Sequence, residues 1–148
     1  MRRARWMLSI LAAACVLAVL PASPAGATPT DGNPFGHLDL VRRVPEGLRV
    51  AGWAIDPDTA APIAVHLYAA GAAHGTSANR SRPDVGARYP AYGSNHGFDL
   101  TIPIGPGGVR VCAYGINVGR GTHNPLIGCH TVVVSNLPFG HIDLVRRA

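Results

Sequence analysis

Apolar and polar side chains alternate along most of the chain after residue 34. In the segment 62–70, Ile63, Val65 and Leu67 fall on the face opposite His66 and Tyr68. This two-residue period is typical of strands with one buried face, whereas an amphipathic helix would repeat every 3.6 residues. The same period recurs over the segments 36–43, 47–55, 98–102, 109–114 and 127–134. The pattern predicts an all-β fold, an Ig-like antiparallel β-sandwich of about seven strands.

Turn-forming residues separate the predicted strands. The first strand, in which Leu38 and Leu40 share one face, ends at Val44-Pro45-Glu46-Gly47. We expect a tight hairpin there, because proline fixes one backbone angle and glycine permits positive φ. A second turn is expected over 103–108. The polar segment 73–95 is longer than most connections, so we expect local order in it, with one helical turn near 82–85.

The first 27 residues have the features of a cleavable signal peptide. Three arginines precede an apolar run from Trp6 to Leu20, and Ala25-Gly26-Ala27 follows as a small-residue cleavage site. The run is shorter than the roughly 20 residues that a transmembrane helix needs. We therefore expect cleavage after Ala27 and a secreted, extracellular protein without a membrane partner. The pair Arg2-Arg3 leaves the export route, Sec or Tat, open.

An internal repeat suggests the domain boundaries. Residues 34–43 (PFGHLDLVRR) recur as residues 138–147 (PFGHIDLVRR), with nine of ten positions identical and an offset of 104 residues. That offset is the size of one sandwich domain. The sequence thus predicts a flexible leader over 28–33, a β-sandwich domain over 34–137 and the truncated start of a second repeat over 138–148.

The second copy of the repeat carries the residue pattern of the first predicted strand. An unpaired strand beside a sheet edge invites pairing or exchange between molecules. One hypothesis is that residues 138–147 drive weak self-association, and the alternative is a frayed tail. The sequence leaves both open.

The overall charge gives only weak evidence for an anionic partner. The chain has 13 basic and 8 acidic residues, but Arg2, Arg3 and Arg5 belong to the predicted signal peptide, which leaves an excess of two positive charges. We therefore expect neither nucleic acid nor an anionic membrane as a partner.

Two cysteines, Cys112 and Cys129, remain once the predicted signal peptide and its Cys15 are removed. An even pair in an exported chain predicts a disulfide, with two free thiols as the alternative. The bond would staple the hairpin whose loop is the segment 118–128. For the sixteen residues between the cysteines, the chain-entropy model gives about 3 kcal/mol of stabilisation.

Several short motifs recur together in one known group of proteins. They are Gly36-His37-Leu38-Asp39, the segment 52–59 (GWAIDPDT), the segment 82–86 (RPDVG), the segment 96–99 (HGFD), Cys112 and Gly128-Cys129. Together they resemble a repeat module of secreted actinobacterial proteins, which is often accessory to cell-wall or carbohydrate-active enzymes. The resemblance covers about residues 34–135. It implies an accessory or surface module with an Ig-like sandwich, and it supplies no catalytic residues.

Metal and catalytic chemistry have little support in the sequence. Asp56 and Asp58 could offer oxygen ligands to Ca²⁺, but Asp-Pro also favours a turn with local hydrogen bonds, which we consider the better interpretation. The seven histidines show no zinc-ligand spacing. No serine lies in Gly-x-Ser-x-Gly. We therefore expect no cofactor and no catalytic residues.

The remaining candidates for binding are the aromatic residues, which could stack on sugar rings or anchor a protein partner: Trp53, Tyr68, Tyr89, Tyr92 and Tyr114. Trp53 lies in a predicted strand, where a tryptophan more often fills the core. Tyr89 and Tyr92 flank a proline in the long polar segment, close to Arg82 and Asp84. These four residues are the predicted binding surface, and the alternative is a loop that packs its own aromatics over the sheet.

These observations favour a non-catalytic secreted interaction module. It would act at the cell envelope or in the extracellular space and bind an unidentified glycan or protein. The first alternative is a small secreted hydrolase or an enzyme inhibitor. The second is a truncated repeat remnant without a present role.

Overall fold

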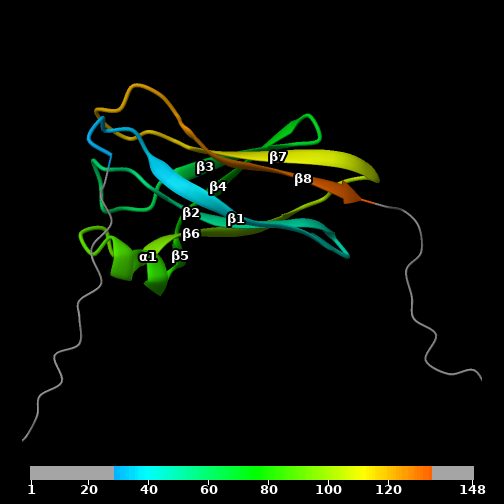
Figure 1. Ribbon diagram of the computed structural model, residues 1–148, viewed down its shortest axis with the longest axis horizontal. Helices are drawn as coiled ribbons and strands as arrows, with labels where there is room; N and C mark the ends of the chain where they lie inside the picture. Colours follow the sequence, from blue (N-terminus) through cyan, green and yellow to red (C-terminus); the bar gives the residue numbers. More distant parts are fainter. Residues whose placement is uncertain (1–28, 135–148) are drawn as a thin grey trace, which may run out of the picture.

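Eight strands and one short helix make up the part of the computed structural model that is described, residues 29–134 (Figure 1). The predicted signal peptide and the second copy of the repeat lie outside the described residues. The elements are β1 (Phe35–Val44), β2 (Gly47–Ile55), β3 (Ala64–Ala69), β4 (Ala72–Ser77), β5 (Arg80–Ser81), α1 (Pro83–Arg88), β6 (Asn95–Ile102), β7 (Gly107–Gly115) and β8 (Leu126–Val134).

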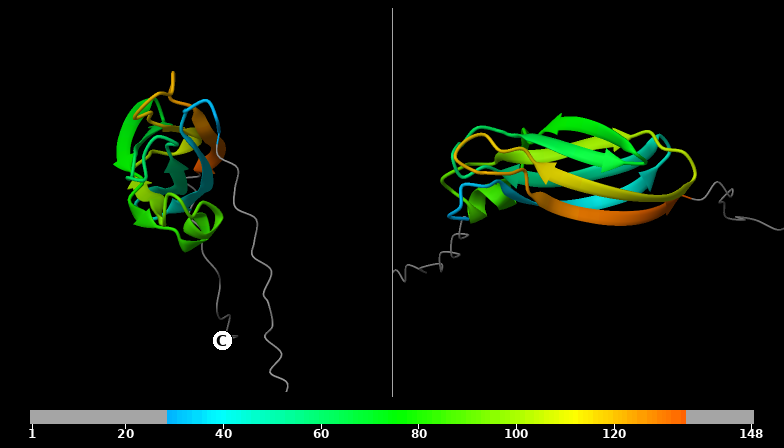
Figure 2. Two further views of the ribbon diagram at one scale, coloured as in Figure 1. Left: turned by 90° about the vertical axis from the view of Figure 1, so that its left-hand side faces the viewer. Right: turned by 90° about the horizontal axis from the view of Figure 1, so that it is seen from above.

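The strands form two antiparallel sheets, which are packed face to face. Sheet I has the strand order β1-β2-β6-β5, and sheet II has the order β4-β3-β7-β8. Seen from above, the long strands of both layers run along the longest axis of the domain (Figure 2). This order matches the two sheets of a constant-type immunoglobulin domain with one strand, β4, added beside β3. The predicted Ig-like sandwich is therefore confirmed, with eight strands in place of about seven.

The two-residue period explains which side chains enter the core. Along β3 every second residue is buried, and Val65 and Leu67 have no exposed surface. Full burial of such a side chain stabilises a fold by about 1.5–3 kcal/mol. The inward faces of both sheets contribute to one core. Its members are Leu38, Leu48, Val50, Ala54, Ile63, Val65, Leu67, Ala69, Ala78, Phe98, Ile102, Val109, Val111, Ala113 and Ile127.

A β-bulge at Asp39 corrects the expected faces of the first strand. The pairing steps from Leu38 opposite Gly52 to Leu40 opposite Ala51 and leaves Asp39 as the extra residue. Because a bulge shifts the two-residue period by one, Leu40 does not join Leu38 in the core. Val41 packs against the core in its place. The expectation that Leu38 and Leu40 share one face was therefore wrong.

The hairpin expected at 44–47 is present, since Val44 pairs with Gly47. The helical turn expected near 82–85 is also confirmed, as α1. The rest of the segment 73–95 is more regular than expected, because it contains β4 and β5. The β3–β4 turn places Ala70 and Gly71 at φ angles of 50° and 78°. Two residues with positive φ are typical of the type I′ hairpin turn.

Residues 31–33, within the segment 28–33 that was expected to be a flexible leader, are held in place by hydrogen bonds. Asn33 is buried, and its side-chain oxygen accepts hydrogen bonds from the backbone N–H groups of Thr122 (2.8 Å) and His123 (3.2 Å). The carboxylate of Asp31 in turn accepts the backbone N–H of Asn33 at 3.0 Å. These bonds tie the start of the domain to the β7–β8 loop. The chain enters the sandwich at this end, and β8 ends at the opposite end (Figure 1).

The predicted disulfide is present. Cys112 on β7 and Cys129 on β8 lie directly opposite each other, with an S–S distance of 2.07 Å. The bond therefore staples the β7–β8 hairpin, as expected from the sequence. It differs from the inter-sheet disulfide of antibody domains, because it joins neighbours within one sheet.

Candidate binding surfaces

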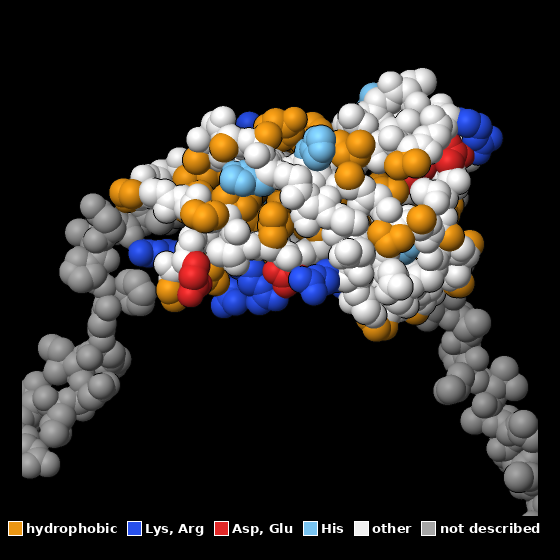
Figure 3. All heavy atoms as spheres, turned by 180° about the vertical axis from the view of Figure 1, so that it is seen from behind, with side chains coloured by type: hydrophobic (Ala, Val, Ile, Leu, Met, Phe, Trp, Pro, Cys, Tyr) orange, Lys and Arg blue, Asp and Glu red, His pale blue; other side chains and the backbone are white. Residues whose placement is uncertain are grey.

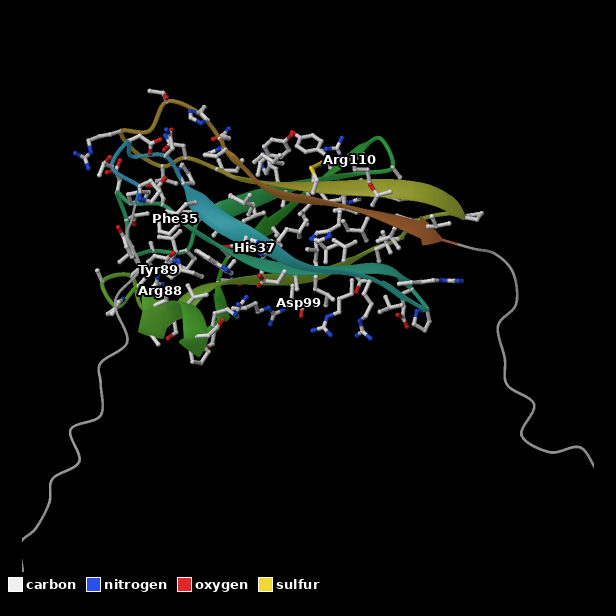
Figure 4. The ribbon with its side chains drawn as sticks, viewed as in Figure 1. Phe35, His37, Arg88, Tyr89, Asp99 and Arg110 are labelled. Atoms are coloured by element: carbon white, nitrogen blue, oxygen red, sulfur yellow. A yellow bond between two sulfur atoms is a disulfide. The ribbon has the colours of Figure 1, made fainter. Side chains whose placement is uncertain are left out.

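The aromatic residues of the predicted binding surface pack against the end of sheet I. The ring of Tyr89 lies 5.1 Å from that of Phe35 and 5.5 Å from that of Trp53, and the ring of Tyr92 lies 6.4 Å from that of Phe35. We call these four residues the aromatic cluster; Figure 4 shows Phe35 and Tyr89 together at one end of the sandwich. All four are partly buried. Tyr89 and Tyr92 thus cover the sheet with much of their ring surface.

Trp53 is not a core residue, which corrects the expectation from its type. It points to the outer side of sheet I, because its neighbours Gly52 and Ala54 are the buried positions. The segment that contains α1 folds over it and supplies Tyr89 as a cover.

A buried histidine closes this segment onto the sheet. His96 has no exposed surface, and its Nε2 lies 2.9 Å from the backbone oxygen of Tyr92. Since a carbonyl oxygen only accepts, Nε2 carries the hydrogen. The other ring nitrogen, Nδ1, is buried and has no hydrogen-bond partner among residues 29–134.

The other two residues of the predicted surface form an ion pair. Arg82 donates to both carboxylate oxygens of Asp84, at 2.8 and 2.7 Å. Because of this bond the pKa of Asp84 is lowered to about 2. Arg82 also reaches across the sheet to Asp39 on β1 at 2.6 Å. Its side chain passes over Gly97, where an added Cβ would come within 2.7 Å of Arg82 Cγ.

The contact between Arg82 and Asp39 gives a structural role to the motifs that support the family resemblance. Asp39 of GHLD and Arg82 of RPDVG bond to each other, and Gly97 of HGFD leaves room for the arginine. The last residue of HGFD, Asp99, accepts hydrogen bonds from Arg49 at 2.9 Å and 2.5 Å. One bond joins β1 to the N-terminal end of α1, and the other joins β2 to β6, across the outer face of sheet I. Figure 4 shows Asp99 on that outer side.

Asp56 and Asp58 form a turn, as the favoured interpretation expected. Asp56 has no exposed surface, and its two carboxylate oxygens accept the backbone N–H groups of Asp58 and Val118, both at 2.8 Å. Asp58 bonds to the side chain and backbone of Arg120, and the side-chain bond is the main reason that its pKa is lowered. Both carboxylates therefore join the β2–β3 connection to the β7–β8 loop.

The outer face of sheet II has a different character. Tyr68 on β3 and Tyr114 on β7 contact each other edge to face, with ring centroids 5.6 Å apart. Tyr68 is 49 % exposed. Together with Ile116, His66 and Asn124, the two rings line a hollow of about 370 Å³. We call this group of five residues the tyrosine face.

Sequence reasoning did not select the tyrosine face, although the signal was present. The residues that alternate with the buried positions of β3 and β7 include Tyr68, His66 and Tyr114. The sequence does not reveal that β3 pairs with β7, which places Tyr114 opposite His66 and Cys112 opposite Tyr68. In Figure 3, hydrophobic and histidine side chains gather over the upper layer and arginines along the lower edge.

The part of the chain that the structure describes contains no group of three or more His, Cys, Asp or Glu side chains that could hold a metal ion. In the same range, no helix has the length and apolar character needed to cross a membrane. No family model matches the sequence, and the search of curated proteins also gives no match.

Proposed function

We propose that this chain is a secreted, non-catalytic module that binds glycan through the tyrosine face. The observation that carries the proposal is the pair of contacting tyrosines, Tyr68 and Tyr114, on the outward side of sheet II. Aromatic rings with one exposed side offer a large apolar surface and a polar hydroxyl. These are the two properties that a sugar ring, with its apolar face and hydroxyl rim, requires.

The groups around the tyrosines support a sugar ligand. His66 and Asn124 supply hydrogen-bond donors and acceptors beside the rings, and Ile116 adds an apolar wall. The hollow of about 370 Å³ has the size of small-ligand sites. A stable protein interface would instead need about 800 Å² of surface from each partner, which is more than these five side chains offer.

The two tyrosines of the tyrosine face stand on a rigid part of the fold. Tyr68 and Tyr114 stand on adjacent strands, and Cys112, which pairs with Tyr68, is bonded to Cys129 on the next strand. Sites on strands are held more accurately than sites on loops. The side chains of Tyr68 and Tyr114 would therefore lose little conformational entropy on binding.

The lining supports a role without catalysis. It contains one histidine and no carboxylate, whereas glycoside hydrolysis generally needs a pair of carboxyl groups. Secretion is supported by the signal-peptide pattern and by the disulfide, since disulfides persist in oxidising compartments. The resemblance to accessory modules of carbohydrate-active enzymes agrees with this function.

A sedimentation assay with purified residues 28–148 and insoluble polysaccharides (peptidoglycan, cellulose and chitin) tests the proposal. We expect one of these to retain the protein, and Tyr68→Ala and Tyr114→Ala each to weaken retention at least tenfold, about 1.4 kcal/mol. The matched control is Val133→Ala, which alters an exposed apolar residue of sheet II outside the hollow.

Equal retention of the wild type and both tyrosine variants would contradict the proposal. So would a protein partner that is captured from culture supernatant and lost with the same variants, in the absence of any polysaccharide binding. Thermal unfolding of each variant shows whether a loss of binding reflects the site or the fold.

A further inference from the structure

We propose that the outer face of sheet I carries a second site, which binds the carboxylate or phosphate groups of an acidic polysaccharide. Three arginines from three strands, Arg42 on β1, Arg49 on β2 and Arg80 on β5, lie around one carboxylate, that of Asp99. We call these three residues the arginine face. It is distinct from the tyrosine face, which belongs to the other sheet.

A groove of about 540 Å³ runs over β2, β6 and β5 beside these arginines. Its floor includes Gly52, Gly97, which lies beneath the side chain of Arg82, and Ala51, whose small side chain leaves this part of the sheet open to close approach. Its polar rim offers hydroxyl and guanidinium groups in addition to the carboxylate. The rim residues are Arg80, Ser81, Arg82, Asp99 and Thr101. Such a rim can bond both the hydroxyl and the charged groups of an acidic sugar.

The arginine face has more positive charges than its one carboxylate, Asp99, can balance. Asp99 bonds only to Arg49, which donates Nε–H and one Nη2 hydrogen to it. A guanidinium has five N–H donors, so three of those on Arg49 remain. Arg42 and Arg80 form no side-chain hydrogen bond or ion pair within residues 29–134, although their charges help to lower the pKa of Asp99. Around Asp99, two positive charges are therefore uncompensated.

Arg82 does not add to this excess, because it is balanced by Asp39 and Asp84. It lies 28 % exposed along the sheet and forms a wall of the groove. The remaining arginines are suited to bind planar anions, since each guanidinium can donate two parallel hydrogen bonds to a carboxylate or phosphate.

The spacing of the arginines favours a polymer over a single ion. Arg42 lies opposite Arg49 in the β1–β2 register, whereas Arg80 stands two strands away from Arg49. Neighbouring strands are about 4.8 Å apart, and Arg80 pairs with Gly97, four residues along β6 from Thr101, which is the partner of Arg49. The backbones of Arg49 and Arg80 are therefore separated by roughly 16 Å. A chain with regularly spaced anions can bind at both positions, and a small ion can bind at only one.

An acidic polysaccharide fits this face better than a nucleic acid does. Single-stranded nucleic acids combine a basic groove with exposed aromatic rings on which the bases stack. On sheet I, Trp53 is partly buried beneath Tyr89, and the residues that line the groove include one aromatic residue, Phe98, which is buried in the core.

Calorimetric titration of residues 28–148 tests the proposal with three probes: polygalacturonate for carboxylates, phosphomannan for phosphates and dextran as the uncharged control. We expect binding to one or both acidic polymers, weaker at higher salt, and no binding to dextran. Arg42→Gln and Arg80→Gln should each weaken the binding about tenfold. Neither substitution should lower the thermal midpoint, because the side chains of Arg42 and Arg80 form no hydrogen bond or ion pair within residues 29–134.

Arg110→Gln is the matched control, since Arg110 is an exposed arginine on sheet II without a side-chain partner in the described residues (Figure 4). It removes the same charge and should leave binding within about twofold of the wild type. An equal loss with all three variants would overturn the proposal, because only the net charge would then matter. The proposal would also fall if neither acidic polymer bound, or if oligodeoxythymidine bound as tightly as the acidic polymers.

Discussion

At the scale of single residues, Gly97 decides how sheet I is held across its width. The side chain of Arg82 lies over this glycine and reaches Asp39 on the far edge strand. An added Cβ at position 97 would meet Arg82 Cγ at 2.7 Å and the backbone oxygen of Arg80 at 3.0 Å. The backbone oxygen of Arg80 cannot easily shift to make room, because it belongs to the main chain of β5.

We expect Gly97→Ala to lower the free energy of unfolding by about 1–3 kcal/mol, which is the usual cost of overpacking. Gly75→Ala is the control, because Gly75 also lies in a strand but has no atom within 4 Å of an added Cβ. Urea unfolding of both variants measures the difference. Equal stabilities would show that Arg82 moves aside without cost.

Another residue-scale expectation concerns Tyr89, which covers the partly buried ring of Trp53. Tyr89→Ala should expose this ring to water and shift its fluorescence to longer wavelength. Trp53 is the single tryptophan of residues 28–148, so the signal has one source. The control is Tyr68→Ala, which removes a tyrosine from the opposite sheet and should leave the spectrum unchanged. If the spectrum of Tyr89→Ala were identical to that of the wild type, groups other than Tyr89 would cover the indole.

At the scale of elements, the disulfide acts on one hairpin. Cys112 and Cys129 join β7 to β8, and these two strands carry the long loop over 116–125. The bond is therefore expected to act mainly by restricting the unfolded chain, and the core packing between the sheets does not depend on it.

Replacing both cysteines by alanine should lower the free energy of unfolding by about 3 kcal/mol. Denaturation followed by Trp53 fluorescence measures this loss. The wild type in reducing agent should match the double variant, and the double variant itself should not respond to the agent. A wild type that is equally stable with and without reducing agent would contradict a stabilising role.

The elements that the sequence predicted well are those with one clearly apolar face. Alternation in β3 and β7 identified both strands and the side that each presents to solvent. β4 was missed because its sequence, AAHGTS, has no large apolar residue to mark a face. The bulge at Asp39 was missed because alternation alone does not reveal an inserted residue.

The binding surfaces could be predicted only in part. For Trp53, the alternation of β2 indicated an outward side chain, whereas the residue type suggested the core; the structure follows the alternation. The tyrosine face and the arginine face both depend on which strands become neighbours. That information lies in long-range pairing, such as β2 with β6 and β3 with β7, and no local pattern contains it.

At the scale of the whole molecule, the two sheets present different chemistry. The outer side of sheet I is charged and organised by ion pairs, whereas that of sheet II carries the exposed tyrosines. The small excess of two positive charges that remains without the predicted signal peptide conceals this separation, because arginines and carboxylates gather on the same sheet. Both outer faces are accessible at once, so the two ligands that we propose would not compete.

The ion pairs make the stability of the domain sensitive to acid. Arginine partners lower the pKa values of Asp58, Asp84 and Asp99, and that of Asp84 is lowered to about 2. A lowered carboxylate pKa stabilises the folded state above the unfolded value of about 4, and this contribution is lost as the pH falls towards 2.

We therefore expect the free energy of unfolding to decrease from about pH 4 to pH 2. In Asp84→Asn part of this decrease should be absent, so that the difference from the wild type shrinks across the same window. The contribution of this exposed pair should remain below about 1 kcal/mol and diminish in high salt. Urea unfolding at several pH values provides the measurement, and a difference that is constant from pH 5 to pH 2 would refute the assignment.

The polypeptide enters this sandwich at one end and leaves β8 at the other (Figure 1). Domains of this shape, linked in tandem with the 104-residue offset of the repeated segment, would be arranged end to end in a linear array. Each domain would then add one more low-affinity contact to the same fibre or wall. Linked contacts of this kind multiply, so even millimolar single sites would give a firm hold through avidity.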